Sequence, residues 1–360
     1  MDRAGLAHAL WRGTSPGARL ARVALLAPAA LYRAAVGVRN AAYDWGLLGS
    51  RALPRPAIGV GNIAVGGVGK TPVAAWLAAE LARRGATPGI LLRGYRGGDE
   101  VEEHRARTPE AVVVADPDRR RGAARAIAAG AQVLVLDDCL QRRELKLDLL
   151  LAVVAAETAG ERRWPLPAGP WREGLGALGR CEGVVVTYKT AAHEAAAAVA
   201  RRLAPRTRTG LGAAAGLEIA RLAPLAGGVS LEAAWLSGRD VVAVCGIGEP
   251  ALFRAQLERL GARVRLMAFG DHHRYAPSDV QSAVAAAGRD GVVVTTAKDA
   301  VRLRPVWPEP APACLVAELD VRVTYGTDAL ARVLDQIGRA AHAAPNPVAA
   351  AVPLDRRISP

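Results

Sequence analysis

The stretch GNIAVGGVGKTP, residues 61–72, decides the fold of this chain. A short apolar run leads into it, and a helical pattern follows over about 70–84. A strand, a glycine-rich turn and a helix in this order form a loop whose backbone N–H groups and helix N-terminus attract phosphate. The usual pattern has a glycine where Ala64 stands, but Gly66, Gly67 and Gly69 still let the backbone approach a ligand closely. We therefore predict a phosphate-binding loop.

The choice of basic residue inside this stretch supports the same interpretation. The chain has 47 basic residues, of which only four are lysines: Lys70, Lys146, Lys189 and Lys298. A lysine ammonium is a compact point charge, whereas the arginine guanidinium is a broad planar fork. In a chain that uses arginine almost everywhere, Lys70 indicates a position where only the smaller cation fits.

The rest of the chain alternates short apolar runs with helical stretches, which predicts a parallel α/β sheet covered on both faces. We expect a phosphate-loop domain over 46–204 and a second, smaller α/β domain over 205–344, with a linker at 205–216. Residues 345–360, rich in alanine and proline, are predicted to be disordered. The four cysteines are scattered without a C-x-x-C pair and are expected to be reduced and buried.

Charge points to an acidic partner. The net charge is +13, and residues 1–45 are predicted to form a basic amphipathic helix. Its apolar run over 20–36 is interrupted by Arg22 and Arg33 and is too short to span a bilayer, but it suits a helix lying in an anionic membrane surface. Packing on the protein's own core is the alternative. Nucleic acid is disfavoured as a partner because aromatic residues make up only 4% of the chain.

Acidic residues follow two of the predicted strands. Asp137 and Asp138 end the run QVLVLDD, the arrangement in which a strand-end aspartate holds Mg²⁺ beside the threonine of a phosphate loop. Asp99 and Glu100 close RGYRGGDE after the second predicted strand, PGILLR, at the edge where open α/β sheets bind ligands. A solvated acidic turn is the alternative for this second pair.

In the second half of the chain, FGDHHRY at 269–275 brings Asp271, His272 and His273 together after a predicted strand. Adjacent histidines on a strand or turn point apart, so a shared metal ion is disfavoured. A histidine that orients a carboxylate base fits better. TTAKD at 295–299 ends another strand with Lys298 and Asp299.

These stretches in combination resemble the tetraacyldisaccharide 4'-kinase family of lipid A biosynthesis. The loop VGNIAVGGVGKTP follows a basic apolar N-terminal helix, and this family often lacks the first loop glycine, as here at Ala64. The blocks that follow in order are RGY, GDE, LDD with Gln141, LPAGPWRE at 166–173, CGIGEPALFRAQLERLG, FGDHHRY and TTAKDAVRL. The resemblance covers about residues 18–340.

The resemblance implies ATP and Mg²⁺ as cofactors and a lipid A disaccharide precursor in the membrane as acceptor, with no obligate protein partner. The implied location is the cytoplasmic face of the inner membrane. Asp99 would be the catalytic base, His272 would hydrogen-bond it, and Arg172 would stabilise the transferred phosphoryl group. Mg²⁺ would be held by Thr71 and Asp138, with Asp137 or Glu100 nearby. The nucleotide-binding residues implied are Ala64, Val65, Gly66, Gly67, Val68, Gly69, Lys70, Thr71, Gln141 and Glu173.

Three departures from the family pattern leave alternatives open. Cys139 and Arg142 replace a glycine and a histidine of the family's DDGxQHR, GDEP has become GDEV, and the stretch between RGY and GDE is short. A family member with reduced or lost activity is therefore one alternative. Another phosphate-loop ATPase or GTPase is the second, although TTAKD lacks the asparagine of the guanine-specific N-K-x-D motif.

Overall fold

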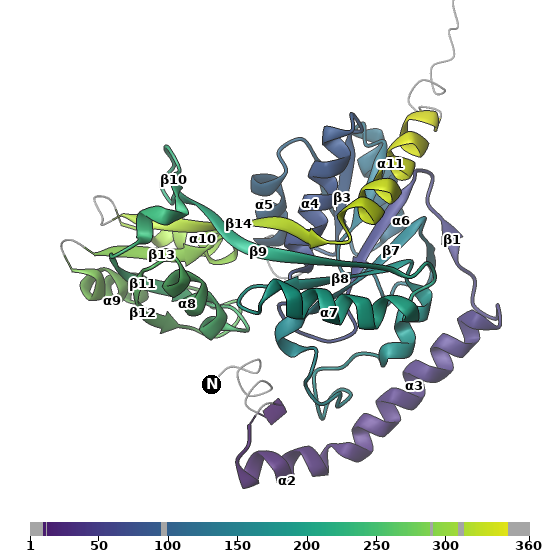
Figure 1. Ribbon diagram of the computed structural model, residues 1–360, viewed down its shortest axis with the longest axis horizontal. Coiled ribbons are helices and arrows are strands. Elements are labelled where there is room, and N and C mark those ends of the chain that lie inside the picture. Colours follow the sequence, from purple (N-terminus) through teal and green to yellow (C-terminus); the bar gives the residue numbers. More distant parts are fainter. Residues whose placement is uncertain (1–9, 12, 95–98, 289–290, 309–312, 345–360) are drawn as a thin grey trace, which may run out of the picture.

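The structure is a computed structural model that describes residues 10–11, 13–94, 99–288, 291–308 and 313–344. Figure 1 shows a large lobe that carries the phosphate loop, a small lobe beside it, and two long strands that run through both. The tail predicted at 345–360 lies outside the described residues, as do residues 95–98 of RGYRGGDE.

The first lobe is built on six parallel strands in the order β4-β3-β5-β2-β7-β8. Their bounds are β2 (Ala57–Gly61), β3 (Pro88–Leu92), β4 (Val112–Ala115), β5 (Val133–Leu136), β7 (Leu149–Ala155) and β8 (Gly183–Tyr188). A separate parallel pair joins β1 (Arg51–Ala52) to β6 (Leu145–Lys146). The predicted phosphate-loop sheet is confirmed.

Helices cover both faces of this sheet because the strands are apolar on both sides. In β5, Val133 and Val135 pack in the core cluster of α4 and α11, whereas Leu134 and Leu136 pack in that of α6. Helix α7 covers the same face as α6 under β7 and β8. The helices are α4 (Lys70–Arg83), α5 (Asp99–Arg107), α6 (Arg119–Ala128), α7 (His193–Leu203) and α11 (Thr327–Ala343).

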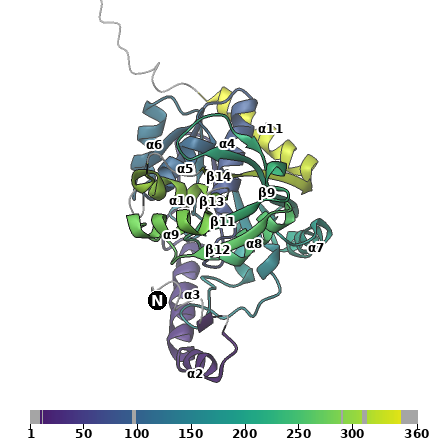
Figure 2. The same ribbon diagram turned by 90° about the vertical axis from the view of Figure 1, so that its left-hand side faces the viewer.

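The second lobe repeats this layering on a smaller scale. Its parallel strands are β11 (Asp240–Cys245), β12 (Arg263–Ala268) and β13 (Val292–Thr296), and its helices are α8 (Pro250–Arg259), α9 (Pro277–Ala287) and α10 (Ala297–Leu303). Helix α8 packs on one face of the strands, and α9 and α10 pack on the other. The predicted second α/β unit is therefore present (Figure 2).

The two lobes share one 12-stranded sheet, in the order β12-β11-β13-β14-β9-β8-β7-β2-β5-β3-β4, with β10 (Leu231–Glu232) paired to β9. The long antiparallel strands β9 (Leu211–Pro224) and β14 (Cys314–Tyr325) join them. Helix α11 then returns to the core of the first lobe. The domain boundaries drawn from the sequence stay a prediction.

The linker predicted at 205–216 is wrong for residues 211–216, which form the first part of β9. The run GLGAAAG looks like a flexible segment, but its small side chains serve packing. A Cβ atom on Gly212 would lie 2.8 Å from Ala204 Cβ and 3.0 Å from the Ala200 carbonyl oxygen. Small residues are required here because β9 passes closely under the end of α7.

Between Pro16 and Asp44 the N-terminal segment forms two helices instead of one continuous helix. Helix α2 (Pro16–Ala24) and helix α3 (Leu26–Asp44) meet at a 46° bend. Among the described residues no single helix is long and apolar enough to cross a membrane, and only this bent pair meets the length and composition criteria together. Both helices lie along the outside of the first lobe (Figure 1). Large apolar side chains on them are exposed: Leu20, Val23, Leu26, Leu31 and Val38.

Candidate functional site

The predicted phosphate loop connects β2 to α4 in the expected geometry. Gly66 and Gly69 adopt φ values of 141° and 84°, which side chains disfavour, and α4 begins at Lys70. A Cβ atom on Gly69 would lie 2.4 Å from Leu217 Cδ1, so bulk is excluded as well. The positive end of α4 is thereby aimed at the space inside the loop.

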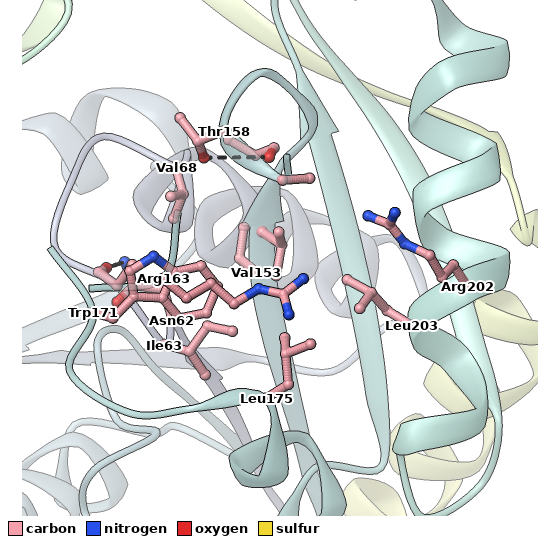
Figure 3. A pocket seen from close by; sticks show the side chains of 14 residues that line it. Asn62, Ile63, Val68, Val153, Thr158, Arg163, Trp171, Leu175, Arg202 and Leu203 are labelled. Atoms are coloured by element: carbon pink, nitrogen blue, oxygen red, sulfur yellow. Dashed lines mark hydrogen bonds between the residues drawn. The ribbon is translucent and has the colours of Figure 1, made fainter. Parts of the chain in front are cut away.

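The first half of the loop is held by the segment LPAGPWRE. Ala64 forms an antiparallel bridge with Trp171, Val65 N–H donates to the Pro170 carbonyl at 2.7 Å, and Arg172 N–H donates to the Ile63 carbonyl at 2.9 Å. An extended bridge accepts any L-residue, which explains why alanine suffices at this position. A small apolar cavity of about 30 Å³ lies behind this part of the loop, with Val153 and Leu175 in its lining (Figure 3).

The second half of the loop is held by the end of β8. Thr187 Oγ1 donates to the Val68 carbonyl at 2.7 Å, and Lys189 Nζ donates to the Gly67 carbonyl at 3.0 Å. Burial lowers the pKa of Lys189, against the opposing charges of Glu249 and Glu157. Sequence reasoning missed Lys189, although the scarcity of lysine that singled out Lys70 applies to it equally.

Asp137 is a buried acceptor at the carboxyl end of β5. Its Oδ2 accepts a hydrogen bond from Thr71 Oγ1 at 2.9 Å and lies 3.2 Å from His104 Nε2. Burial raises the pKa of Asp137, but the hydrogen bond and charge of His104 and the charge of Lys70 outweigh it, so the pKa is lowered. Sequence reasoning missed His104, whose fully buried place on α5 no local pattern indicates.

Asp138 differs sharply from its neighbour. It adopts a φ of 53°, which is unusual for a residue with a side chain, and 43% of its side chain is exposed. Its Oδ1 lies 3.0 Å from Arg172 Nη1 and 3.7 Å from Lys70 Nζ. The turn therefore directs the Asp137 carboxylate into the core and the Asp138 carboxylate toward Arg172 and Lys70. We call this group of side chains, together with Glu173 behind it, the loop edge.

Glu100 and Asp99 open helix α5 near this pair. Burial raises the pKa of Glu100, and the charge of Asp137 raises it further. The structure therefore brings Glu100 within electrostatic reach of the two aspartates. The side chain of Asp99 lies outside the part of the chain that the structure describes.

Gln141 and Glu173 lie behind Arg172. Gln141 Nε2 donates to the Asn62 carbonyl at 3.0 Å and lies 3.3 Å from Glu173 Oε1. Arg180 pairs with the same Glu173 oxygen at 2.9 Å. The structure thus brings together the predicted residues around the loop, and it places Gln141 and Glu173 as partners of other side chains.

Two of the three departures from the family pattern, Cys139 and Arg142, make contacts with neighbouring groups. Cys139 is buried with its thiol 3.5 Å from the Val60 carbonyl, and burial raises its pKa, so the thiol stays protonated. All four cysteines are free and buried, as predicted. Arg142 lies 3.4 Å from Glu144 through its Nη1 atom.

The second lobe contributes a second polar edge at the carboxyl ends of β11, β12 and β13. Lys298 Nζ pairs with Asp271 Oδ1 at 2.7 Å, and His272 Nε2 lies 3.9 Å from Asp271 Oδ2. His273 turns away to Asp279 at 2.9 Å, so the two histidines point apart as expected. In the described part of the chain, no group of three or more His, Cys, Asp or Glu side chains is arranged to hold a metal.

A cavity of about 1140 Å³ lies between the first half of the phosphate loop, the second lobe and the N-terminal segment. The loop lines it through residues 64–68, the second lobe through Glu249 and Asp271, and the N-terminal segment through Arg19 and Arg22. Helix α5 packs against α10, which brings the helix that begins at Asp99 close to the second edge. The cavity is large enough for a sugar-sized ligand beside a nucleotide phosphate.

Known proteins match this chain over almost its whole length. A family model described as tetraacyldisaccharide-1-P 4'-kinase matches residues 21–339. The tetraacyldisaccharide 4'-kinase of Anaeromyxobacter sp. (strain K) is 38% identical, with 94% of this chain and 97% of that protein covered. The protein of the same name from Methylobacterium sp. (strain 4-46) is 40% identical, with 84% and 89% covered.

A solved structure gives the same result. The crystal structure of LpxK from Aquifex aeolicus in complex with ATP superimposes with a TM-score of 0.67 at 26% identity, covering 88% of this chain and 99% of that one. The resemblance predicted from the sequence blocks is confirmed, and with it the phosphate-loop kinase fold. This chain belongs to the tetraacyldisaccharide-1-phosphate 4'-kinase family.

Proposed function

We propose that this protein is an ATP-dependent kinase that phosphorylates the 4'-hydroxyl of a tetraacyldisaccharide 1-phosphate, the lipid A precursor. The observation that carries the proposal is the large cavity that the phosphate loop shares with the N-terminal helices and the second lobe. A nucleotide on the loop would present its terminal phosphate to an acceptor in this cavity. A switch ATPase or GTPase does not need an acceptor space of this size.

The nucleotide would be held by the loop residues 64–71. Its phosphates would lie against the backbone N–H groups of the loop and the N-terminus of α4, with Lys70 as the point charge beside them. Lys70 lies 3.7 Å from Asp138 Oδ1, so it is already directed to the side where the metal ligands gather. Gln141 and Glu173 would order this side of the site.

Mg²⁺ fits the residues near the loop. Asp137 Oδ1 is buried and, among the described residues, has no hydrogen-bond partner, while Oδ2 holds the Thr71 hydroxyl. Mg²⁺ prefers oxygen ligands and usually combines one or two carboxylates with phosphate oxygens and waters. We assign Thr71, Asp137 and Asp138 as its holders, with Glu100 nearby. The ion would neutralise charge on the transferred phosphoryl group.

Transfer needs a base for the sugar hydroxyl and cations for the phosphoryl oxygens. Asp99, at the start of α5, would accept the 4'-hydroxyl proton, and His272 on the second edge would hydrogen-bond Asp99 and adjust its basicity. Arg172 would stabilise the charge that spreads over the phosphoryl oxygens in the transition state.

The acceptor is a membrane lipid, and the N-terminal helices suit its location. Leu20, Val23 and Leu31 are exposed on α2 and α3, and Arg19 and Arg22 of α2 line the cavity. Exposed apolar and basic side chains on one helix favour an anionic membrane surface. We place the protein at the cytoplasmic face of the inner membrane, where ATP and the lipid meet.

The test is transfer of labelled γ-phosphate from Mg·ATP to a tetraacyldisaccharide 1-phosphate in detergent micelles. Wild type, Lys70→Ala and Asp99→Ala are compared, with the exposed Arg263→Ala as a matched surface control. We expect product from wild type and Arg263→Ala only, with the lipid still bound by Asp99→Ala. Absence of product from wild type that binds ATP would overturn the proposed function, and equal loss of turnover and lipid binding in Asp99→Ala would remove its role as base.

A further inference from the structure

Helix α3 is hydrogen-bonded directly to the polar residues behind the phosphate loop. Asn40 Nδ2 donates to Glu173 Oε2 at 2.7 Å, and Arg39 Nη2 donates to the Gln141 carbonyl at 3.1 Å. These bonds join residues 133 and 102 positions apart in the chain. A helix that only anchored the protein to a membrane would not need side chains directed into the catalytic edge.

From Asn40, polar contacts continue without a break to Asp138. Glu173, only 7% exposed, uses its other oxygen for Gln141 Nε2 at 3.3 Å. Gln141 Oε1 in turn accepts from Arg172 Nη1 at 3.3 Å, and the same nitrogen donates to Asp138 Oδ1 at 3.0 Å. Hydrogen bonds of this kind strengthen one another in a buried setting, so displacement of one member is felt by the next.

A second set of contacts fixes the end of α3 to the same turn of the chain. Arg143 Nη1 donates to the Asn40 carbonyl at 2.7 Å, and its Nη2 pairs with Asp44 at 2.6 Å. The Arg143 guanidinium also lies 5.1 Å from the centre of the Tyr43 ring. Arg143 follows Gln141 in the segment that begins at Asp138, so α3 and the catalytic turn are held as one unit.

We propose that α3 is a positioning element for phosphoryl transfer and that Asn40 is its principal positioning residue. In this role Asn40 contacts neither the transferred phosphoryl group nor the sugar 4'-hydroxyl. It fixes the Glu173 carboxylate, which orients Gln141 and through it the Arg172 guanidinium beside Asp138. The inference rests on the proposed kinase function and adds to it that the N-terminal helix sets the catalytic rate as well as the location of the enzyme.

The test compares full-length wild type with Asn40→Ala, Asn40→Asp, and Asn40→Asp combined with Glu173→Gln. Ala34→Ser, an exposed and uncharged change on the same helix, is the control. For each protein we would measure kcat and KM for ATP in micelles at saturating lipid, co-sedimentation with phosphatidylglycerol vesicles, and the melting temperature.

We expect Asn40→Ala to lower kcat about tenfold, the effect of losing one hydrogen bond to a carboxylate, with KM for ATP and vesicle binding unchanged. Asn40→Asp should lower kcat further, because two carboxylates then face each other, and Glu173→Gln in the same chain should restore part of that loss. Ala34→Ser should keep the wild-type kcat and vesicle binding.

The inference is overturned if Asn40→Ala keeps the wild-type kcat, or if the double variant is no faster than Asn40→Asp. It is also overturned if kcat and vesicle binding fall in parallel, since Asn40 would then act through membrane anchoring. Inactive wild type would instead contradict the proposed function, so the two failures are distinguishable.

Discussion

Polar side chains gather at the carboxyl ends of the strands in both lobes, and the two groups differ in their surroundings. At the loop edge, the carboxylates of Asp137, Asp138 and Glu173 are met by side chains from distant parts of the chain, including α3, α4, α5 and the segment that ends at Arg180. At the edge of the second lobe, Asp299 is fully buried; its partners are Thr296 and Arg302, each three residues away in the chain, and Gly246 N–H at the end of β11.

The difference indicates that the loop edge serves catalysis and that the second edge serves the stability of the fold. At the loop edge Asp138 is half-exposed and adopts a strained φ, features found where function outweighs local stability. At the second edge Asp299 is fully buried, and Thr296 caps the start of α10 by accepting a hydrogen bond from the Asp299 N–H. We therefore expect changes at the loop edge to act mainly on turnover and changes at the second edge to act mainly on folding.

The sharpest test of this comparison uses one lysine from each edge. Lys70→Ala should lower kcat by about 10²–10³-fold, because a preorganised cation beside the phosphates is lost. Lys298 is already paired with Asp271 at 2.7 Å, so Lys298→Ala should cost only about tenfold. Steady-state kinetics of both variants at saturating ATP provide the measurement. Equal losses would mean that the second edge contributes as much to transfer as the first.

A change at the second edge should act on stability. Asp299→Ala leaves Gly246 N–H and Arg302 without their buried carboxylate, and we expect the free energy of unfolding to fall by about 3 kcal/mol. Urea denaturation would measure it. Asp240→Asn is the control, because its pair with Arg263 is exposed and its loss should leave the denaturation midpoint unchanged. A stable but inactive Asp299→Ala variant would contradict the comparison.

Within the loop, alanine variants of two glycines distinguish a glycine that backbone conformation requires from one that has open space around it. Gly69→Ala should lower the free energy of unfolding by about 2 kcal/mol, because its φ of 84° and its contact with Leu217 both oppose a Cβ atom. Gly67 has open space around its Cβ position, and Gly67→Ala should leave stability unchanged. Thermal unfolding without nucleotide would compare them, and equal melting temperatures would refute the argument.

The smallest predicted effect is on stability and concerns Glu157, whose carboxylate binds the segment 189–191 beside the loop. Burial raises the pKa of Glu157, but N–H donors from residues 189–191 outweigh it and lower the pKa below the ordinary value of 4.5. A lowered folded-state pKa gives stability that is present above 4.5 and is lost as the pH falls through the folded-state value.

Glu157→Gln should therefore reduce the free energy of unfolding at pH 7 by less than about 1 kcal/mol, since this carboxylate is only partly buried and solvent screens it. The difference from wild type should shrink as the pH falls below 4.5. Denaturation curves over this range would measure it, and a difference that persists or grows in acid would show that Glu157 does not act through its charge.

Much of the fold could be predicted because its signals are local. The helix predicted at about 70–84 is α4 with Gly85 at a φ of 81° after its end, and QVLVLDD forms β5 followed by its two aspartates. Strand β9 was missed because GLGAAAG lacks the branched apolar residues of a strand. Its small side chains are explained only by the nearby end of α7.

The residues of the site likewise fall into two groups, those that the local sequence predicts and those that only the tertiary structure brings together. The sequence by itself determined the loop, its lysine and the strand-end aspartates, because phosphate and Mg²⁺ demand these residue types at fixed spacing. The tertiary structure alone decided that His104 supports Asp137, that Lys189 holds the Gly67 carbonyl and that Asn40 reaches Glu173. Such partners come from anywhere in the chain, because a buried polar group requires a hydrogen bond but no particular sequence separation.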